Sequence, residues 1–167
     1  AGLNVPQTVA AITAEDIIEA FSSFGGKPII TKHNRAGKGL GVALFRSKPA
    51  LVEYVNGEDF DPSVDGITLV QRYIASPEQL ITRVEFVGRK FVYAVRVDTS
   101  NGFELCPADF CALDASTCMA DADQRFAFDI DGSFSKSALG QLLIPKMQDV
   151  MAREGLDVAA FEFIKDE

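Results

Sequence analysis

A glycine-rich loop near residue 35 is the first part of the sequence whose residue types could do chemistry. It reads Lys32-His-Asn-Arg-Ala-Gly37-Lys38-Gly39-Leu-Gly41. Alternate glycines allow backbone N–H groups to approach an anion that side chains would otherwise keep away. A Walker A loop and a dinucleotide-binding loop are excluded, because each needs a helix after its last glycine and residues 42–45 are typical of a strand. The pattern indicates a hairpin flap that closes over phosphates, or else a flexible surface hairpin.

Ile30 and Lys32 occupy alternate positions of the apolar segment before this loop, residues 28–32. If the segment is a strand, both side chains point to the same side of it. An apolar side chain beside an ammonium group suits a nucleotide, with Ile30 under a base and Lys32 near the phosphates. The alternative is a solvated lysine on a surface hairpin.

A second group of polar residues lies on a predicted hairpin. Residues 80–87 and 90–97 are typical of strands, and Gly88-Arg89 between them suits a two-residue turn. A regular hairpin pairs Arg83 with Ala94 and Ile81 with Arg96, which places four charged residues on one face, namely Arg83, Glu85, Arg96 and Asp98. The other face is then apolar, with Leu80, Thr82, Val84, Phe86, Phe91, Tyr93, Val95 and Val97. Arginine forks bind phosphate and carboxylate oxygens, so Arg96 first and Arg83 second are catalytic candidates for a transferring phosphoryl group, unless the face is only solvated.

Glu162 lies between Phe161 and Phe163 in the last predicted strand, residues 158–165. Because side chains alternate along a strand, its carboxylate points away from the two aromatic rings. A carboxylate at the centre of an apolar strand is costly unless it is paired or bound to a metal ion. We therefore expect Glu162 to be a metal ligand.

The elements that must position these residues alternate irregularly along the chain. One helix is capped by Thr13 and stopped by Gly25, a second begins at Ser47 and ends at Gly57, and a third covers residues 137–153 with an interruption at Pro145. The remaining strands are predicted over residues 8–12, 28–32, 42–45 and 67–74, and residues 106–134 are mostly loop. This order predicts an α+β fold, not a doubly wound parallel sheet.

The composition narrows the class of protein and its partners. The chain has 167 residues, 47% of them hydrophobic, which suits an ordinary soluble protein of one domain or two small lobes. A net charge of −8 argues against nucleic acid as the main partner, although a local basic cradle can still bind a nucleotide. No apolar run could span a membrane and no signal peptide is recognisable. The cysteines, at 106, 111 and 118, fit free thiols in a reducing cytoplasm better than a zinc site.

Several segments resemble the ATP-grasp family, and together they cover most of the chain. Pro28-Ile-Ile-Thr-Lys32 followed by Gly39-x-Gly41-Val is similar to the family's strand lysine and glycine loop. The stretch Leu69-Val-Gln71-Arg72-Tyr73-Ile74-Ala-Ser-Pro77-Glu78 resembles the segment that links its two lobes. Gly155-Leu-Asp157-Val-Ala-Ala-Phe161-Glu162-Phe163-Ile164 resembles its final strand, and Gly2-Leu-Asn-Val-Pro6-Gln-Thr8 is similar to the usual start of the domain.

The resemblance implies a fold and a set of site residues. Two α+β lobes with largely antiparallel sheets would clasp ATP between them, with residues 1–69 as the N-terminal lobe and 70–167 as the C-terminal lobe. The implied nucleotide-binding residues are Ile30, Lys32, Gly37, Lys38, Gly39 and Gly41, then Gln71, Arg72 and Tyr73 beside the adenine, Ile74 packed on it, and Glu78 at the ribose. Glu162 would bind Mg²⁺, and Arg96 and Arg83 would stabilise developing negative charge.

The function implied by the resemblance is an ATP- and Mg²⁺-dependent ligase that activates a carboxylate as an acyl phosphate for attack by an amine. The pattern resembles that of the glutamate ligases that modify ribosomal protein S6 and of glutathione synthases. A carboxylate–thiol ligase or phosphotransferase on the same fold, and a non-catalytic ATP-binding module, are the alternatives. The family's second acidic metal ligand, its asparagine and its other phosphate-binding lysine have no counterpart here, so we expect a fragment with weak activity or none. The substrates (small molecules or peptides) and the oligomeric state stay open.

Overall fold

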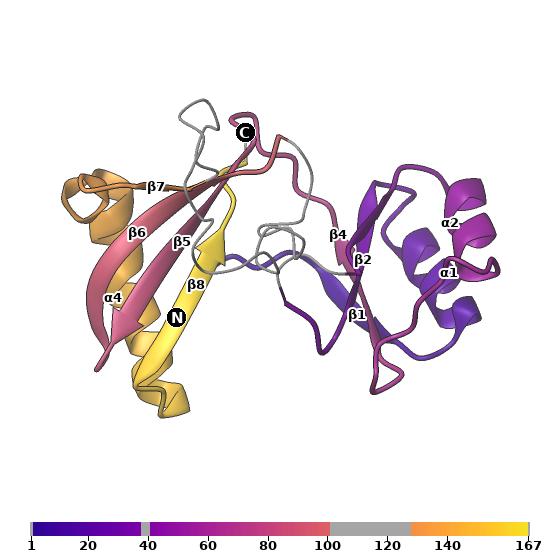
Figure 1. Cartoon of the computed structure of the whole chain (residues 1–167), viewed down its shortest axis with the longest axis horizontal. Helices are drawn as coiled ribbons and strands as arrows, with labels where there is room; N and C mark the ends of the chain where they lie inside the picture. Colours follow the sequence, from indigo (N-terminus) through magenta and orange to yellow (C-terminus); the bar gives the residue numbers. More distant parts are fainter. Residues whose placement is uncertain (1, 38–40, 101–127, 167) are drawn as a thin grey trace, which may run out of the picture. The chain divides into compact units, whose positions relative to one another are not determined.

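The computed structural model describes residues 2–37, 41–100 and 128–166, which form two compact units (Figure 1). One unit is Val5–Ile74, and the other combines Ala1–Asn4 with Ala75–Glu167. Each contains a four-stranded sheet whose neighbouring strands are antiparallel. The predicted α+β class is therefore confirmed. Among the described residues, no helix is long and apolar enough to cross a membrane.

In the unit Val5–Ile74 the strand order is β1-β4-β2-β3. The elements are β1 (Thr8–Ala11), α1 (Ala14–Ser23), β2 (Ile29–His33), β3 (Ala43–Phe45), α2 (Lys48–Val55) and β4 (Thr68–Arg72). Strand β4 pairs with both β1 and β2, so the whole strand belongs to this sheet. The lobe boundary predicted between residues 69 and 70 falls inside β4, whereas the compact units divide after Ile74.

The two helices of this unit cover one face of its sheet. Helix α1 begins at the predicted cap, where the backbone N–H of Asp16 donates to Thr13 Oγ1 at 3.1 Å and that of Thr13 donates to Asp16 Oδ2 at 3.0 Å. The bonds that Asp16 accepts lower the pKa of its carboxyl. Residues of both helices and of the sheet share one core, which includes Ile17, Phe21, Ile29, Leu51 and Val70. The alternate side chains of β2 and β4 therefore lie on the face that the helices leave open.

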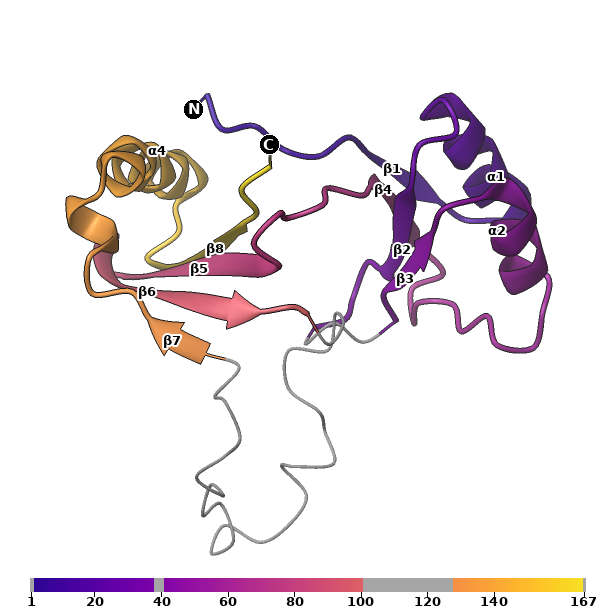
Figure 2. The same cartoon turned by 90° about the horizontal axis from the view of Figure 1, so that it is seen from above.

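The second unit has the strand order β7-β6-β5-β8. Its elements are β5 (Leu80–Val87), β6 (Lys90–Asp98), β7 (Phe128–Ile130), the short 3₁₀ helix η1 (Phe134–Lys136), α4 (Ala138–Glu154) and β8 (Val158–Phe163). Figure 2 shows α4 lying along one face of this sheet. The core between them contains Val84, Phe86, Ala94, Phe134, Met147 and Met151. Strand β7 and η1 were not predicted, because the acidic residues around them have weak periodicity.

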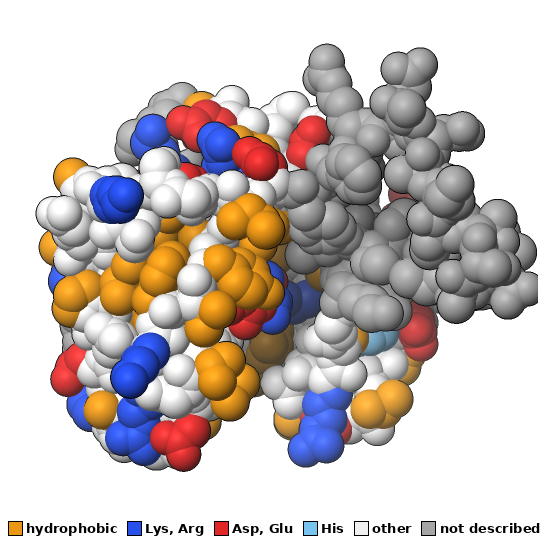
Figure 3. Space-filling model, turned by 60° about the vertical axis from the view of Figure 1, so that its left-hand side comes forward, with side chains coloured by type: hydrophobic (Ala, Val, Ile, Leu, Met, Phe, Trp, Pro, Cys, Tyr) orange, Lys and Arg blue, Asp and Glu red, His pale blue; other side chains and the backbone are white. Residues whose placement is uncertain are grey.

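Some large apolar side chains of this unit stay exposed. Figure 3 shows an orange patch of such side chains on the left-hand body, bordered by Lys, Arg, Asp and Glu. Among the described residues of the unit, the exposed large hydrophobic ones are Val87, Val92, Tyr93, Ile130, Leu139, Leu142, Leu156, Val158 and Ile164.

Helix α4 runs through Pro145 without a break, so the predicted interruption is wrong. Proline removes one backbone hydrogen bond and crowds the preceding turn, which disfavours a helix interior. Here the buried residues Met147 and Met151, beyond the proline, pack against the sheet and favour a continuous helix. The predicted ends are confirmed, because Ser137 Oγ accepts from the N–H of Gly140 at 3.0 Å and Gly155 ends the helix with φ 67°.

Replacing Gly140 with alanine should destabilise this unit by roughly 1–3 kcal/mol. An added Cβ would lie 1.9 Å from the carbonyl oxygen of Phe134, so backbone atoms of η1 or α4 must move. Denaturant unfolding of the variant measures the loss. Gly132→Ala is the matched control, since its Cβ would meet nothing within 4 Å, and it should change stability by less than about 1 kcal/mol. Equal stability of the two variants would contradict the close packing of η1 on α4.

The β5–β6 hairpin contains a bulge that shifts its register. Phe86 pairs with Phe91 at the turn, but Glu85 pairs with Tyr93 and Arg83 with Val95, so Val92 is an extra residue in β6. The predicted pairing of Arg83 with Ala94 is therefore wrong. Because one extra residue exchanges the two faces of a strand, Tyr93, Val95 and Val97 lie on the face of Arg83 and Glu85, not on the core face. Arg96 then shares the opposite face with Ala94, towards α4.

Candidate functional site

Lys32 lies half-buried on the open face of the first sheet, with its ammonium group held by a neighbouring strand. Lys32 Nζ donates to Gln71 Oε1 at 3.2 Å, and Gln71 Nε2 donates to Thr8 Oγ1 at 2.7 Å. Ile30 shares this face, as predicted, since Ile29 and Thr31 on either side of it are buried against the helices. The sheet thus places an apolar side chain and a cation next to each other above β2.

The described ends of the glycine loop are anchored to the rest of this unit. Asn34 Nδ2 donates to Asp65 Oδ2 at 2.8 Å, and Arg35 Nε lies 3.5 Å from the same oxygen. The hydrogen bonds from Asn34 first and then from Ser63 hold the pKa of Asp65 at about 2, so its carboxylate is ionised at neutral pH. These contacts fix the start of the loop.

The far end of the loop is fixed at Gly41. Gly41 has φ 70°, and a Cβ there would lie 2.7 Å from the ring of His33. His33 Nε2 in turn donates to the carbonyl oxygen of Asp61 at 2.6 Å. Gly41 is thus required both by its backbone conformation and by the close approach of the imidazole ring. Gly37 is exposed, while Lys38 and Gly39, two predicted phosphate contacts, lie outside the described residues.

The segment after β4 is tied to the sheet through its backbone. The N–H groups of Arg72 and Tyr73 donate to the carbonyl oxygens of Gln7 and Pro28, both at 2.9 Å. The Arg46 guanidinium lies 5.7 Å from the centre of the Tyr73 ring, within cation–π range. Tyr73 and Ile74 are half-buried and Arg72 is exposed. Contact of these residues with an adenine ring stays a prediction.

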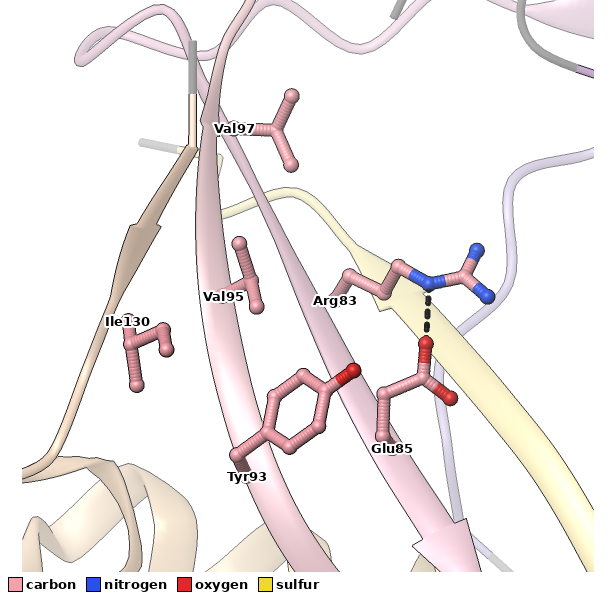
Figure 4. A pocket seen from close by; sticks show the side chains of 6 residues that line it. All are labelled: Arg83, Glu85, Tyr93, Val95, Val97 and Ile130. Carbon is pink, nitrogen blue, oxygen red and sulfur yellow. Dashed lines mark hydrogen bonds and ion pairs between the residues drawn. The ribbon is translucent and has the colours of Figure 1, made fainter. Parts of the chain in front are cut away.

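Arg83 lies between two carboxylates on the open face of the second sheet, and Figure 4 shows its contact with one of them, Glu85. Its Nε donates to Glu85 Oε1 at 2.6 Å and its Nη1 donates to Glu162 Oε1 at 2.8 Å. Glu162 reaches it because β8 pairs with β5 in a register that sets Glu162 opposite Arg83. The side chains of Arg83, Glu85 and Glu162 are 44%, 23% and 43% exposed. The hydrogen bonds from Arg83 to Glu85 and then Glu162 raise the pKa of the guanidinium.

A shallow hollow of about 320 Å³ opens beside this cluster, and it is lined by Arg83, Glu85, Tyr93, Val95, Val97 and Ile130 (Figure 4). It joins an apolar wall from β6 and β7 to a charged wall from β5. The expectation that Tyr93, Val95 and Val97 belong to the core is wrong, because the bulge at Val92 leaves no recognisable pattern in the sequence. Glu85 was placed on the correct face through its two-residue spacing from Arg83, but it was not expected to bind that arginine.

The other predicted site residues of this unit are paired elsewhere. Arg96 Nη2 donates to Asp129 Oδ2 of β7 at 2.9 Å, on the opposite face from Arg83, so the expectation that both arginines share one face is wrong. Glu78, the predicted ribose ligand, forms an ion pair with Lys165 at 3.1 Å. In the described ranges, no three His, Cys, Asp or Glu side chains gather closely enough to form a metal site by themselves.

Comparison with proteins of known structure identifies the fold of the chain. No protein-family model matches the chain, and no curated protein matches its sequence. Solved structures do match in fold, and several of them are ATP-grasp proteins. The chain therefore has the ATP-grasp fold, as its sequence segments predicted.

Three of these structures show the extent of the match. A RimK domain protein ATP-grasp from Sphaerobacter thermophilus DSM 20745 is 18% identical with a TM-score of 0.56, and the match covers 98% of this chain and 48% of that one. D-cycloserine synthetase DcsG is 12% identical with a TM-score of 0.62, covering 99% and 54%. The ATP-grasp ligase PsnB, complexed with minimal precursor, Mg and ADP, is 12% identical with a TM-score of 0.60, covering 99% and 42%. The chain thus spans about half the length of these proteins.

Proposed function

We propose that this protein is an ATP- and Mg²⁺-dependent ligase, which activates a carboxylate as an acyl phosphate for attack by an amine. The observation that carries the proposal is the cluster of Arg83, Glu85 and Glu162, a guanidinium between two carboxylates on the open face of a sheet. Such a group of charges suits a magnesium-bound phosphoryl group. The ATP-grasp fold of the chain also supports a ligase.

The unit Val5–Ile74 would bind the nucleotide. Lys32 would hold phosphate oxygens through its ammonium group, and the backbone N–H groups of the loop of residues 37–41 would add neutral donors. Ile30 would pack against the base on the same face of the sheet. The backbone and side chains of residues 72–74 would border the adenine ring. Glu78 would bind the ribose hydroxyls, which requires it to leave its exposed ion pair with Lys165.

Magnesium fits the oxygen atoms that the second unit offers. Glu85 and Glu162 each contact Arg83 through Oε1, which leaves the second oxygen of each carboxylate to coordinate a cation. A guanidinium with two carboxylates has a net charge of −1, so a divalent cation would also balance the cluster. When bound, Mg²⁺ supplies positive charge to the phosphates. Arg83, not Arg96, is the group on this face that would stabilise the negative charge that grows during transfer.

The proposed reaction has two covalent steps. In the first, a carboxylate oxygen of the substrate forms a bond to the γ-phosphorus of ATP and the bond to the oxygen of ADP breaks. In the second, an amine nitrogen forms a bond to the acyl carbon, phosphate leaves and the nitrogen loses a proton. Small molecules and peptides are both candidate substrates, and the peptide class is supported by PsnB, which is complexed with a precursor peptide. An added amine that raises the release of ADP and phosphate would support a ligase over a non-catalytic module.

Nucleotide binding is the first test of this function. Isothermal titration of the folded chain with ATP and Mg²⁺ should show weak binding, and in the same experiment Lys32→Ala should lose roughly 1.5–3 kcal/mol of binding free energy, the range of a hydrogen bond to a charged group. Lys27→Ala, at an exposed lysine before β2, is the matched control and should bind as the parent does. A folded chain that binds no adenine nucleotide would overturn the proposed function.

A further inference from the structure

A series of three hydrogen bonds connects Lys32 to the backbone of Pro6, just before β1. Lys32 Nζ donates to Gln71 Oε1 at 3.2 Å, Gln71 Nε2 donates to Thr8 Oγ1 at 2.7 Å, and Thr8 Oγ1 donates to the carbonyl oxygen of Pro6 at 3.0 Å. The three side chains come from β2, β4 and β1, and all of them belong to the unit Val5–Ile74. Both the oxygen and the nitrogen of the Gln71 amide are thus hydrogen-bonded, one to β2 and the other to β1.

The groups at the two ends of this hydrogen-bond series fix which group donates and which accepts at every step. The carbonyl oxygen of Pro6 can only accept, so the single hydroxyl hydrogen of Thr8 points to it. Thr8 Oγ1 must then accept from Gln71, which requires the NH₂ group of the amide on that side. The amide oxygen is left facing Lys32, whose ammonium group can only donate. Both ends therefore demand the same orientation of the Gln71 amide.

The hydrogen-bond series also determines how many N–H donors and how much charge Lys32 keeps for a ligand. Gln71 accepts one of the three ammonium hydrogens, so two donors stay available. Because Gln71 is neutral, the full positive charge of Lys32 is kept, which a carboxylate at the same place would cancel. A lysine side chain has four rotatable carbon–carbon bonds and loses much rotamer entropy when it is ordered, so a partner that orders it before the ligand arrives raises affinity.

We propose that Gln71 is a positioning residue, which holds the Lys32 ammonium group for the phosphates of a nucleotide and does not contact the base. Thr8 fixes the amide of Gln71 in the orientation that Lys32 needs. The inference rests on the proposed function, in which Lys32 binds phosphate. It differs from the role that the family resemblance implies for Gln71, at the edge of the adenine.

Two ligands separate these roles, because ATP has phosphates and adenosine does not. Gln71→Leu should lower ATP affinity about tenfold and Thr8→Val about threefold, the range of one hydrogen bond to a charged and to a neutral group. Gln71→Glu should lower it at least as much as Gln71→Leu, since it cancels the charge. Adenosine affinity, measured by NMR titration, should stay within about twofold for all three variants because none of them touches the base.

Thr31→Val is the matched control, because Thr31 neighbours Lys32 but is buried on the other face, where its hydroxyl has no partner within the described residues. It should leave both affinities unchanged. If Gln71→Leu lowers ATP and adenosine affinity by the same factor, or if Thr8→Val has no effect on ATP, Gln71 is not a positioning residue. A parent chain that binds neither ligand overturns the proposed function instead, so the two failures are distinguishable. Thermal melts of each variant confirm that it is folded.

Discussion

Replacing Arg83 by methionine should lower the rate of ADP formation in the native protein roughly 10²–10³-fold, with a much smaller change in the KM for ATP. Arg83 is the one residue of its cluster with positive charge, and it lies beside the hollow on the open face of the second sheet. In the proposed function, negative charge grows on the transferring phosphoryl group, and a fixed guanidinium stabilises it more in the transition state than in the bound substrate. Steady-state kinetics at saturating ATP measures the effect.

The controls for Arg83 come from two other arginines of the same β5–β6 hairpin. Arg89 is also 44% exposed and forms an ion pair with Asp157 at 2.9 Å, so Arg89→Met removes a comparable pair at the hairpin turn. Arg96→Met removes the arginine that the sequence ranked first but that the bulge places towards α4. Both should keep most of the activity. A loss in Arg96→Met that equals the loss in Arg83→Met would restore the sequence-based ranking and contradict our assignment.

Much of the fold could be predicted from short-range signals in the sequence. The helix cap at Thr13, the turn at Gly88-Arg89 and the stop at Gly155 each depend on a few neighbouring residues, and each is confirmed. The alternation of Ile30 and Lys32 follows from the two-residue period of a strand, and burial confirms it. The failures have longer-range causes. Packing of Met147 and Met151 carries α4 through Pro145, and pairing with β6 defines the short strand β7.

The candidate site could be predicted only where residues act within one strand. The spacing of Arg83 and Glu85 placed them on one face, but a single extra residue, Val92, exchanged the faces of β6 and moved Arg96 away. The contact of Arg83 with Glu162 depends on the register between β5 and β8, which lie far apart in sequence. The bond from Lys32 to Gln71 likewise joins different strands. Pairing register is set by the whole sheet, so no local pattern reveals it.

Glu162 has two candidate roles, a structural ion pair and a metal ligand. The exposure of its side chain argues against a large structural contribution. A buried carboxylate paired with arginine would cost roughly 3–5 kcal/mol when replaced. The pair of Glu162 and Arg83 is instead 43% and 44% exposed, and exposed pairs contribute at most about 1 kcal/mol. Arg83 also keeps Glu85 as a partner. The ion pair alone therefore gives little reason for a carboxylate at this position of β8.

Glu162→Gln should raise the Mg²⁺ concentration that the native protein needs for half-maximal activity by on the order of 10- to 100-fold, the usual loss when a group that supports a metal site is removed. The amide keeps the volume of the side chain but loses the charge that attracts the cation, so the melting temperature should fall by only a few degrees. A Mg²⁺ titration of activity alongside a thermal melt measures both. Asp157→Asn is the matched control, because it removes another exposed carboxylate paired with an arginine in the same unit, and its Mg²⁺ dependence should equal that of the parent. A large fall in melting temperature with unchanged Mg²⁺ dependence would make Glu162 a structural residue and remove it from the metal site.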